Sequence, residues 1–306
     1  MPFKVAAFYQ FAALPDFREL RESLRAACAD LGLKGSVLLA HEGINGTLAG
    51  SADAVGQSIQ ALRNGDLFGG RLDNLELKFS AASAMPFQRL KIRLKKEIVT
   101  LGDSQTDPTR QVGIYVDPAD WNALIAAPDT LLIDTRNAFE VAMGTFAGAL
   151  DPGLESFGQF KDFAAQKLDP VKHRKIAMFC TGGIRCEKAS SFLKHEGFEN
   201  VFHLKGGILK YLEEVKSEDS LWQGGCFVFD ERVAVGHGLK VLDFSICHGC
   251  LAPVSADDRA SAKFEQGVCC PACADKLSDE QKASNRERQR QVDLAAKRGL
   301  KHLGPL

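Results

Sequence analysis

The stretch that decides the fold of the middle of this chain is IAMFCTGGIRCEKAS, residues 176–190. Its first four residues are apolar and read as a strand, and the glycines after Cys180 permit a tight turn before a helix. Backbone N–H groups in such a turn can point inward, next to a helix N-terminus and Arg185. These features favour a thiolate over a thiol, so we expect Cys180 to be a nucleophile. The alternative is a buried cysteine that ends a core strand.

The turn supplies the rest of the expected active-site loop, which consists of Thr181, Gly182, Gly183 and Ile184. Cys186 lies one loop away from Cys180. It could be a resolving thiol that closes a disulfide after Cys180 is oxidised, or only a small residue in the first helical turn. A disulfide would require the two Cα atoms to lie about 4.4–6.8 Å apart.

Composition limits the classes of protein to which the chain can belong. The 306 residues are 45% hydrophobic and 25% charged, with a net charge of −1, as in a soluble globular protein of two or three domains. No apolar run is long enough to cross a bilayer, and the N-terminus lacks a signal-peptide core. Nine cysteines then favour catalysis or metal binding over structural disulfides. We expect a cytoplasmic protein with no membrane or DNA partner, whose nucleic-acid contacts come from local basic patches.

The alternation of apolar patterns predicts an α/β protein in three parts. Residues 1–102 show the order β-α-β-β-α-β, the split βαβ pattern of a ferredoxin-like domain, and end in a long basic strand or strand pair over 90–101. Residues 103–118 read as a linker. In residues 119–225 short apolar strands alternate with helices, which predicts a mainly parallel sheet covered on both faces. Residues 226–306 are rich in cysteine and end in a charged, helical segment.

Reactive groups of parallel sheets lie beyond the carboxyl ends of the strands. Asp134 ends the apolar strand 131–134, as Cys180 ends the strand 176–180. We therefore place Asp134 in the same site, where it can accept hydrogen bonds from loop amides. We expect Arg136 to pair with Glu140 four residues later, as an ion pair that stiffens the strand end.

Two C-x2-C motifs near the C-terminus have the spacing of a four-cysteine zinc site. Their members are Cys247, Cys250, Cys270 and Cys273. Cys269 could replace Cys270 as a ligand. Four thiolates leave no open coordination position, so we expect the zinc to be structural. The alternative is a set of reduced thiols in a small core.

Basic residues cluster on the expected strand near residue 90 and in the C-terminal tail. The strand cluster, which we call the basic stripe, comprises Arg89, Lys91, Arg93, Lys95 and Lys96; the tail cluster comprises Lys282, Arg286, Arg288, Arg290, Lys297, Arg298 and Lys301. Charged residues that alternate with apolar ones on a strand form a positive stripe suited to a phosphate backbone, although a solvated face is the usual meaning of such runs.

Four motifs in order resemble rhodanese domains. They are DTRNAFE at residues 134–140, GA at 148–149, CTGGIR at 180–185 and KGGI at 205–208. The resemblance implies that the loop cysteine carries a persulfide or otherwise acts as the nucleophile, cradled by loop amides. Those roles fall on Cys180 and on residues 181–185.

Almost the whole chain is similar to the bacterial tRNA uridine hydroxylase family. The similarity lies in HEGINGT at residues 41–47, KIRLKKEIV at 91–99 and CEKA at 186–189. It implies oxygen-dependent formation of 5-hydroxyuridine at the wobble position 34, with the tRNA anticodon region as partner and molecular oxygen as co-substrate. We include His41 and Asn45 of the first motif among the expected RNA contacts.

Two other functions compete with this one. A sulfurtransferase would use Cys180 as a persulfide carrier with thiosulfate, and a non-enzymatic tRNA-binding protein would not need the thiol. The chain shows no 2-His-1-carboxylate iron motif and no flavin motif that would explain oxygen activation.

Overall fold

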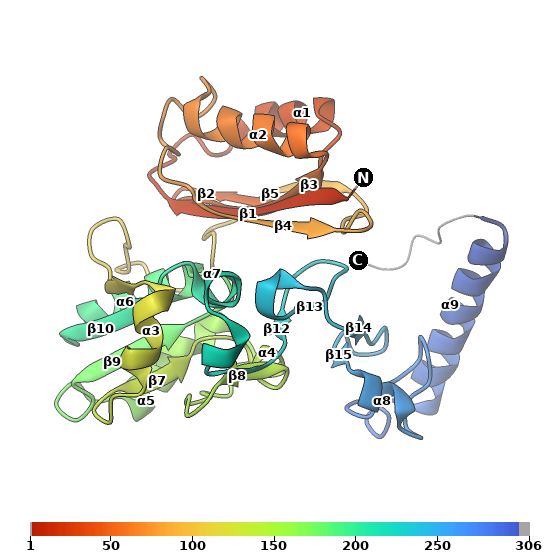
Figure 1. The fold of residues 1–306 in the computed structure, drawn as a ribbon. Helices are drawn as coiled ribbons and strands as arrows, with labels where there is room; N and C mark the ends of the chain where they lie inside the picture. The colour runs from red at the N-terminus through yellow and green to blue at the C-terminus, as the bar shows by residue number, and fades with distance from the viewer. Residues whose placement is uncertain (1, 300–306) are drawn as a thin grey trace. The chain divides into compact units, whose positions relative to one another are not determined.

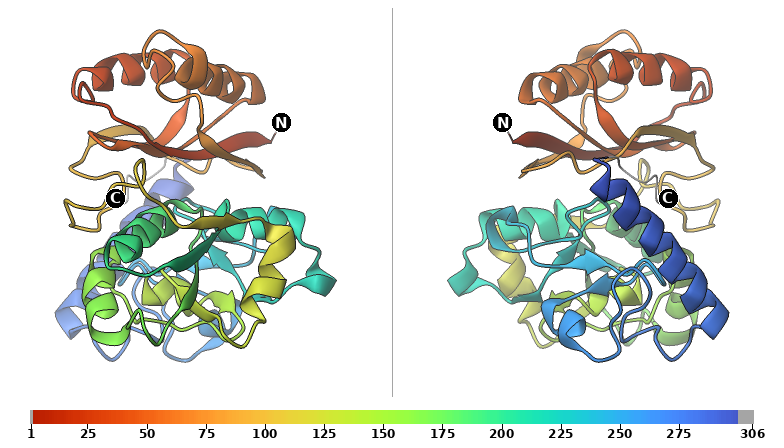
Figure 2. Two further views of the ribbon diagram at one scale, coloured as in Figure 1. Left: turned by 90° about the vertical axis from the view of Figure 1, so that its left-hand side faces the viewer. Right: turned by 90° about the vertical axis from the view of Figure 1, so that its right-hand side faces the viewer.

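The computed structural model describes residues 2–299, so Lys301 of the tail cluster lies outside the described residues. The N-terminal sheet has the strand order β4-β1-β3-β2-β5 (Figure 1). Its members are β1 (Phe3–Phe11), β2 (Lys34–Ala40), β3 (Gly43–Gly50), β4 (Glu76–Ala82) and β5 (Leu90–Leu94). Helices α1 (Leu20–Asp30) and α2 (Ala52–Asn64) cover one face (Figure 2). The predicted ferredoxin-like fold is confirmed, with β5 added parallel to β2 at the sheet edge.

The basic strand is shorter than predicted, because β5 ends at Leu94 and not near residue 101. Beyond its end, two carboxylates accept hydrogen bonds from backbone N–H groups that a continued strand would pair with a neighbour. Glu42 accepts a hydrogen bond from the Ile98 N–H at 2.7 Å, and Glu97 accepts from the Leu101 and Gly102 N–H groups. These side-chain acceptors make a turn where the sequence pattern suggested a strand.

The second sheet is fully parallel and has the order β6-β10-β9-β7. Its strands are β6 (Ile114–Val116), β7 (Leu131–Asp134), β9 (Lys175–Phe179) and β10 (Asn200–Leu204). Alternate residues of β9 enter different cores: Ile176 and Met178 pack on one face, and Ala177 and Phe179 pack on the other. The continuous apolar run therefore reflects a strand buried on both sides, as predicted.

Helices and short strands surround this sheet. They are α3 (Pro118–Ile125), α4 (Ala138–Val141), β8 (Gly144–Phe146), α5 (Phe160–Lys167), α6 (Ile184–His195), α7 (Gly207–Glu214) and β11 (Trp222–Gly224), with short 3-10 helices at Phe157–Gln159, Ser217–Asp219 and His237–Leu239. Among residues 2–299, no helix combines the length and apolar character needed to cross a bilayer.

By its internal contacts the chain divides into two compact units. The first extends to Glu231 and includes residues 235–240, so it holds both sheets; the second contains residues 232–234 and the chain from Val241 onward. The remaining elements are β12 (Cys226–Phe227), β13 (Ala234–Val235), β14 (Ser245–Ile246), β15 (Pro253–Val254), α8 (Ala256–Ala260) and α9 (Asp279–Lys297). Ser278 caps α9, and the charged segment that follows it is helical as expected.

Candidate active site and candidate metal centre

Cys180 lies directly after β9, and α6 begins four residues later at Ile184. The Gly183 N–H donates to Cys180 Sγ at 3.1 Å, and the Cys186 N–H also hydrogen-bonds the sulfur. Gly183 has φ +106°, a conformation that a residue with a Cβ adopts only under strain. The loop backbone is held from the other side, because the Ile208 N–H of α7 donates to the Cys180 carbonyl at 2.9 Å. Two backbone N–H groups, those of Gly183 and Cys186, therefore point at this sulfur.

The surroundings of Cys180 favour the thiolate. Burial by itself raises the pKa of the Cys180 thiol, but hydrogen bonds from Cys186 and the positive charge of Arg185 outweigh it and lower the pKa well below its usual value. Burial and the charge of Cys180 raise the pKa of the Cys186 thiol, so Cys186 keeps its proton and acts as the donor of the pair. Cys186 also lies 3.4 Å from Thr135 Oγ1.

Arg185 is held beside the loop by a buried carboxylate. Its guanidinium donates to both oxygens of Glu140, at 2.6 and 2.8 Å, and also to Thr181 Oγ1 at 3.1 Å. Glu140 has no exposed side-chain surface. The ion pair therefore fixes the guanidinium, and with it a positive charge, close to the cysteine.

The expected pairing of Arg136 with Glu140 is wrong. Arg136 turns back to Asp134, to which it donates at 2.9 and 2.6 Å, and it also donates to the Gly144 carbonyl. Both side chains are fully buried. Glu140 is free to pair with Arg185 because the carboxylate of Asp134 already neutralises Arg136. Asp134 accepts one loop amide, that of Arg136, as well as the Thr145 hydroxyl.

Side chains of the N-terminal sheet also reach the loop, which the sequence analysis missed. Tyr9 of β1 donates to Glu187 of α6 at 2.6 Å, and Lys78 of β4 donates to the Gly182 carbonyl at 2.8 Å. Nearby, Lys188 of α6 pairs with Glu42 and Glu97. The only local signal was the CEKA motif, since no spacing in the sequence links Tyr9 or Lys78 to partners that lie 178 and 104 residues further along the chain.

Cys180 is completely buried, with no side-chain surface open to solvent. The groups that cover its loop include polar ones. Lys78 donates a hydrogen bond to the Gly182 carbonyl, and the Tyr9 hydroxyl is so close to Gly183 that a Cβ added there would lie 2.7 Å from it. The sulfur is therefore covered but still receives the backbone N–H groups.

The residues expected to contact RNA lie on the exposed part of the N-terminal sheet and its loops. In the basic stripe Arg89, Arg93, Lys95 and Lys96 are exposed, and Lys91 is half-buried. Burial and the charges of Arg89 and Arg93 lower the pKa of Lys91. His41 is exposed, whereas the Asn45 amide donates to the Ile98 carbonyl and so has a structural contact. His41 and Lys96 line one cavity of about 560 Å³.

In the tail, several cations of α9 are already engaged within the C-terminal unit. Arg286 donates to both oxygens of Glu265, Arg288 donates to the carbonyls of His248 and Gly267, and Arg290 pairs with Glu287. The contacts of Arg286 and Arg288 orient α9 against the cysteine region, whereas the Arg290 pair lies within the helix. They leave less of the tail charge available for a phosphate backbone.

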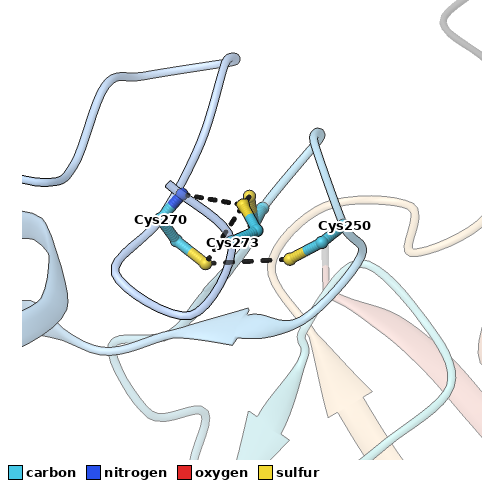
Figure 3. A group of neighbouring side chains, drawn as sticks. Cys250, Cys270 and Cys273 are labelled. Atoms are coloured by element: carbon cyan, nitrogen blue, oxygen red, sulfur yellow. Dashed lines mark hydrogen bonds between the residues drawn. The ribbon is translucent and has the colours of Figure 1, made fainter. Parts of the chain in front are cut away.

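The sulfur atoms of Cys247, Cys250, Cys270 and Cys273 converge within 4.8 Å of one another. Figure 3 shows the last three of them pointing together. Three of the Sγ···Sγ distances are 3.7, 3.8 and 3.9 Å. A tetrahedron with Zn–S arms of about 2.3 Å has edges of about 3.8 Å, so the four sulfurs have the spacing of zinc ligands and not of disulfides. Cys269 lies outside the cluster and contacts the Lys263 carbonyl.

Taken together, a parallel four-stranded sheet and a cysteine in a loop of amides define a rhodanese-like domain. Residues 117–214 match the rhodanese-like domain model, and residues 3–98 match the UPF0176 acylphosphatase-like domain model. The tRNA uridine(34) hydroxylase of Bradyrhizobium diazoefficiens is 75% identical over 78% of this chain and 94% of its own length. The enzyme of the same name from Brucella anthropi is 54% identical over 99% of this chain and 99% of its own length. That of Agrobacterium fabrum is 55% identical over 99% of this chain and 95% of its own length. The chain belongs to the tRNA uridine(34) hydroxylase family.

Proposed function

We propose that this protein is an enzyme that hydroxylates C5 of uridine 34 in tRNA, in the cytoplasm, with Cys180 as the nucleophile. The observation that supports this most strongly is the buried Cys180 sulfur, which receives two backbone N–H groups and has its pKa lowered beside Arg185. The choice of uridine 34 of tRNA as the substrate rests on the full-length similarity to proteins named tRNA uridine(34) hydroxylase.

The chemistry starts with addition of the thiolate to C6 of the uracil ring, which makes C5 electron-rich. C5 then attacks an oxygen species at the peroxide level; the O–O bond breaks, and the second oxygen leaves with the electron pair. Loss of the C5 proton and expulsion of the thiolate restore the C5=C6 bond. Molecular oxygen takes up four electrons in forming one hydroxyl and one water, and C5 supplies two of them. Two thiol groups from solution, which are oxidised to a disulfide, supply the other two electrons and bring the oxygen to the peroxide level.

Each residue around the sulfur has a role in this scheme. The backbone N–H groups of Gly183 and Cys186 and the Arg185 charge stabilise the thiolate, both as the attacking group and as the leaving group. Cys186 donates a hydrogen bond to it. Asp134 acts through Arg136 and the strand end, so it is a positioning residue. Because Cys180 is covered, binding of uridine requires the contact of Lys78 with the loop to open.

The proposed function is tested by incubating the purified protein with unmodified tRNA, a thiol and isotopically labelled oxygen gas. Mass spectrometry of the nucleosides should find 5-hydroxyuridine that contains the label. Transfer of sulfur from thiosulfate to cyanide with unchanged nucleosides would instead identify a sulfurtransferase.

The basic stripe is proposed to contact the tRNA backbone. The double variant Lys91→Ala/Arg93→Ala removes two adjacent cations. We expect weaker tRNA binding at every ionic strength and a decrease of about 2 in the slope of log affinity against log salt concentration. Filter binding across a salt series measures both. The matched control is Lys172→Ala/Arg174→Ala, an exposed pair with the same spacing on the rhodanese-like part; an equal effect there would refute the assignment.

The four-cysteine cluster is proposed to hold one structural zinc ion. When bound, the ion would join two segments of the C-terminal unit, because two ligands come from each C-x2-C motif. We expect about one zinc per chain by mass spectrometry of the metal. Cys273→Ala should lose the zinc and unfold this unit, whereas Cys269→Ala should retain it, since that sulfur lies outside the cluster. Zinc loss in the Cys269 variant alone would contradict the ligand set.

A further inference from the structure

Five ionisable side chains next to the active-site loop have no role in the scheme above. This group, the Glu187 cluster, consists of Tyr9, Glu76, Lys78, Tyr115 and Glu187. Tyr9 Oη donates to Glu187 Oε1 at 2.6 Å, and Tyr115 also hydrogen-bonds Glu187. Lys78 Nζ lies 3.2 Å from Glu76 Oε1 and donates to the Gly182 carbonyl. The cluster joins strands β1, β4 and β6 to the start of α6.

Glu187 is close to the reacting sulfur. Its backbone N–H donates to the Gly183 carbonyl at 3.0 Å in the first turn of α6, and its carboxylate interacts electrostatically with Cys180. Tyr9 lies against Gly183, where an added Cβ would be 2.7 Å from the hydroxyl. Both side chains therefore lie next to the loop that holds Cys180.

Glu187 differs from the other carboxylates near the loop in its partners. Asp134 and Glu140 each neutralise an arginine, whereas Glu187 is hydrogen-bonded by two tyrosine hydroxyls. Burial raises the pKa of Glu187 to about 7; the hydroxyls of Tyr9 and Tyr115 act in the opposite direction, and the charges of Glu76 and Cys180 add to the increase. Lys78 is the cation of the cluster, and its charge interacts with both Glu76 and Glu187. A carboxylate in this setting can accept a proton near neutral pH.

We propose that Glu187, held by Tyr9, accepts the proton that leaves C5 of uracil when the Cys180 thiolate is expelled. This inference rests on the proposed function. In the step the C5–H bond breaks and its electron pair forms the C5=C6 bond. The C6–S bond breaks and leaves its pair on sulfur, and the proton goes to the Glu187 carboxylate. No oxidant takes part, because the oxygen atom has already been transferred.

Tyr9 is a positioning residue in this scheme. Burial and the negative charges of Glu187, Glu76 and Cys180 raise its pKa well above the usual value, so it remains a hydroxyl donor. Because Tyr9 comes from β1, the N-terminal domain contributes to catalysis as well as to RNA binding. This explains why a ferredoxin-like sheet lies directly on the loop.

The test is the pH dependence of 5-hydroxyuridine formation in a single turnover, with full-length protein and unmodified tRNA. The wild-type rate should fall as the pH decreases through about 7 and Glu187 becomes protonated. This decrease of the rate toward low pH is the acid limb of the pH profile. Glu187→Gln should slow the reaction by about 100-fold and remove the acid limb. Tyr9→Phe removes a hydrogen bond that lowers the pKa of Glu187, so the limb should move to higher pH. A purely structural role for Tyr9 would scale the rate without moving the limb.

Tyr211→Phe is the matched control. Its hydroxyl is also buried and donates to Asn122 at 2.7 Å, but in contact with α3 and not with the loop. Its pH profile should equal that of wild type. If wild type makes no 5-hydroxyuridine, the proposed function fails. If wild type is active while Glu187→Gln keeps the acid limb, or Tyr9→Phe leaves the limb in place, only this inference fails.

Discussion

Replacing Cys180 with alanine is expected to abolish 5-hydroxyuridine at position 34. Without the sulfur no group can add to C6, and the amides and Arg185 have no thiolate to stabilise. Cys180→Ser should be almost as inactive, because a serine hydroxyl in the same cup remains protonated at neutral pH. The measurement is mass spectrometry of tRNA nucleosides from a strain that lacks the wild-type gene and carries each variant.

Cys28→Ala is the control for this prediction. Cys28 is also buried, but burial raises the pKa of its thiol to about 11, and it lies on α1, where it packs into the core of the N-terminal domain. Its loss should leave the modification in place. Equal tRNA binding by wild type and Cys180→Ala would show that the defect is chemical. Retained 5-hydroxyuridine in the Cys180 variants would refute both the addition mechanism and any route in which this sulfur transfers the oxygen atom.

The surroundings of Cys180 could be predicted from the sequence because the residues that form them lie close together in the chain. A strand, two glycines, an arginine and a helix start occur within ten residues, so the amide cup around Cys180 follows from the chain itself. The four-cysteine cluster was predictable for the same reason, since two C-x2-C motifs determine their own geometry. The structure also distinguishes Cys270 from Cys269, which spacing alone did not.

The pairing of the charged side chains and the contacts between distant segments could not be predicted in this way. Arg136 and Glu140 have the spacing of a helical ion pair, yet each finds a partner elsewhere: Asp134 lies two residues before Arg136, and Arg185 reaches Glu140 from a different element. Tyr9 and Lys78 alternate with core residues on their strands, which shows that they face away from α1 and α2. Nothing in the sequence shows that the opposite face covers the loop.

The largest loss of stability is expected from Glu140→Ala. This change leaves the Arg185 guanidinium buried without its counter-charge, and breaking a buried pair on one side costs about 3–5 kcal/mol. Urea unfolding followed by tryptophan fluorescence reports on the right region, because Trp121 and Trp222 both belong to the core around the second sheet. Glu155→Ala, at an exposed position of the same domain, should change the free energy of unfolding by less than about 0.5 kcal/mol.

The pH dependence of this effect has a definite sign. Burial opposes ionisation of Glu140, but the charge of Arg185 dominates and lowers its pKa in the folded state. The stabilisation is therefore fully present above the unfolded-state pKa of about 4.3 and is lost as the pH falls through the folded-state value. The difference in free energy of unfolding between wild type and Glu140→Ala should stay constant from neutral pH down to the unfolded-state pKa of about 4.3, and should shrink at lower pH.

A double variant separates the structural from the catalytic contribution of the pair. Glu140→Leu with Arg185→Met replaces both charges by apolar groups of similar size, which often costs little or even stabilises a protein. We expect most of the stability lost in Glu140→Ala to return. We expect the double variant to be inactive in hydroxylation, because it lacks the positive charge of Arg185 that favours the Cys180 thiolate. A stable and fully active double variant would show that the amide cup alone suffices to ionise the cysteine.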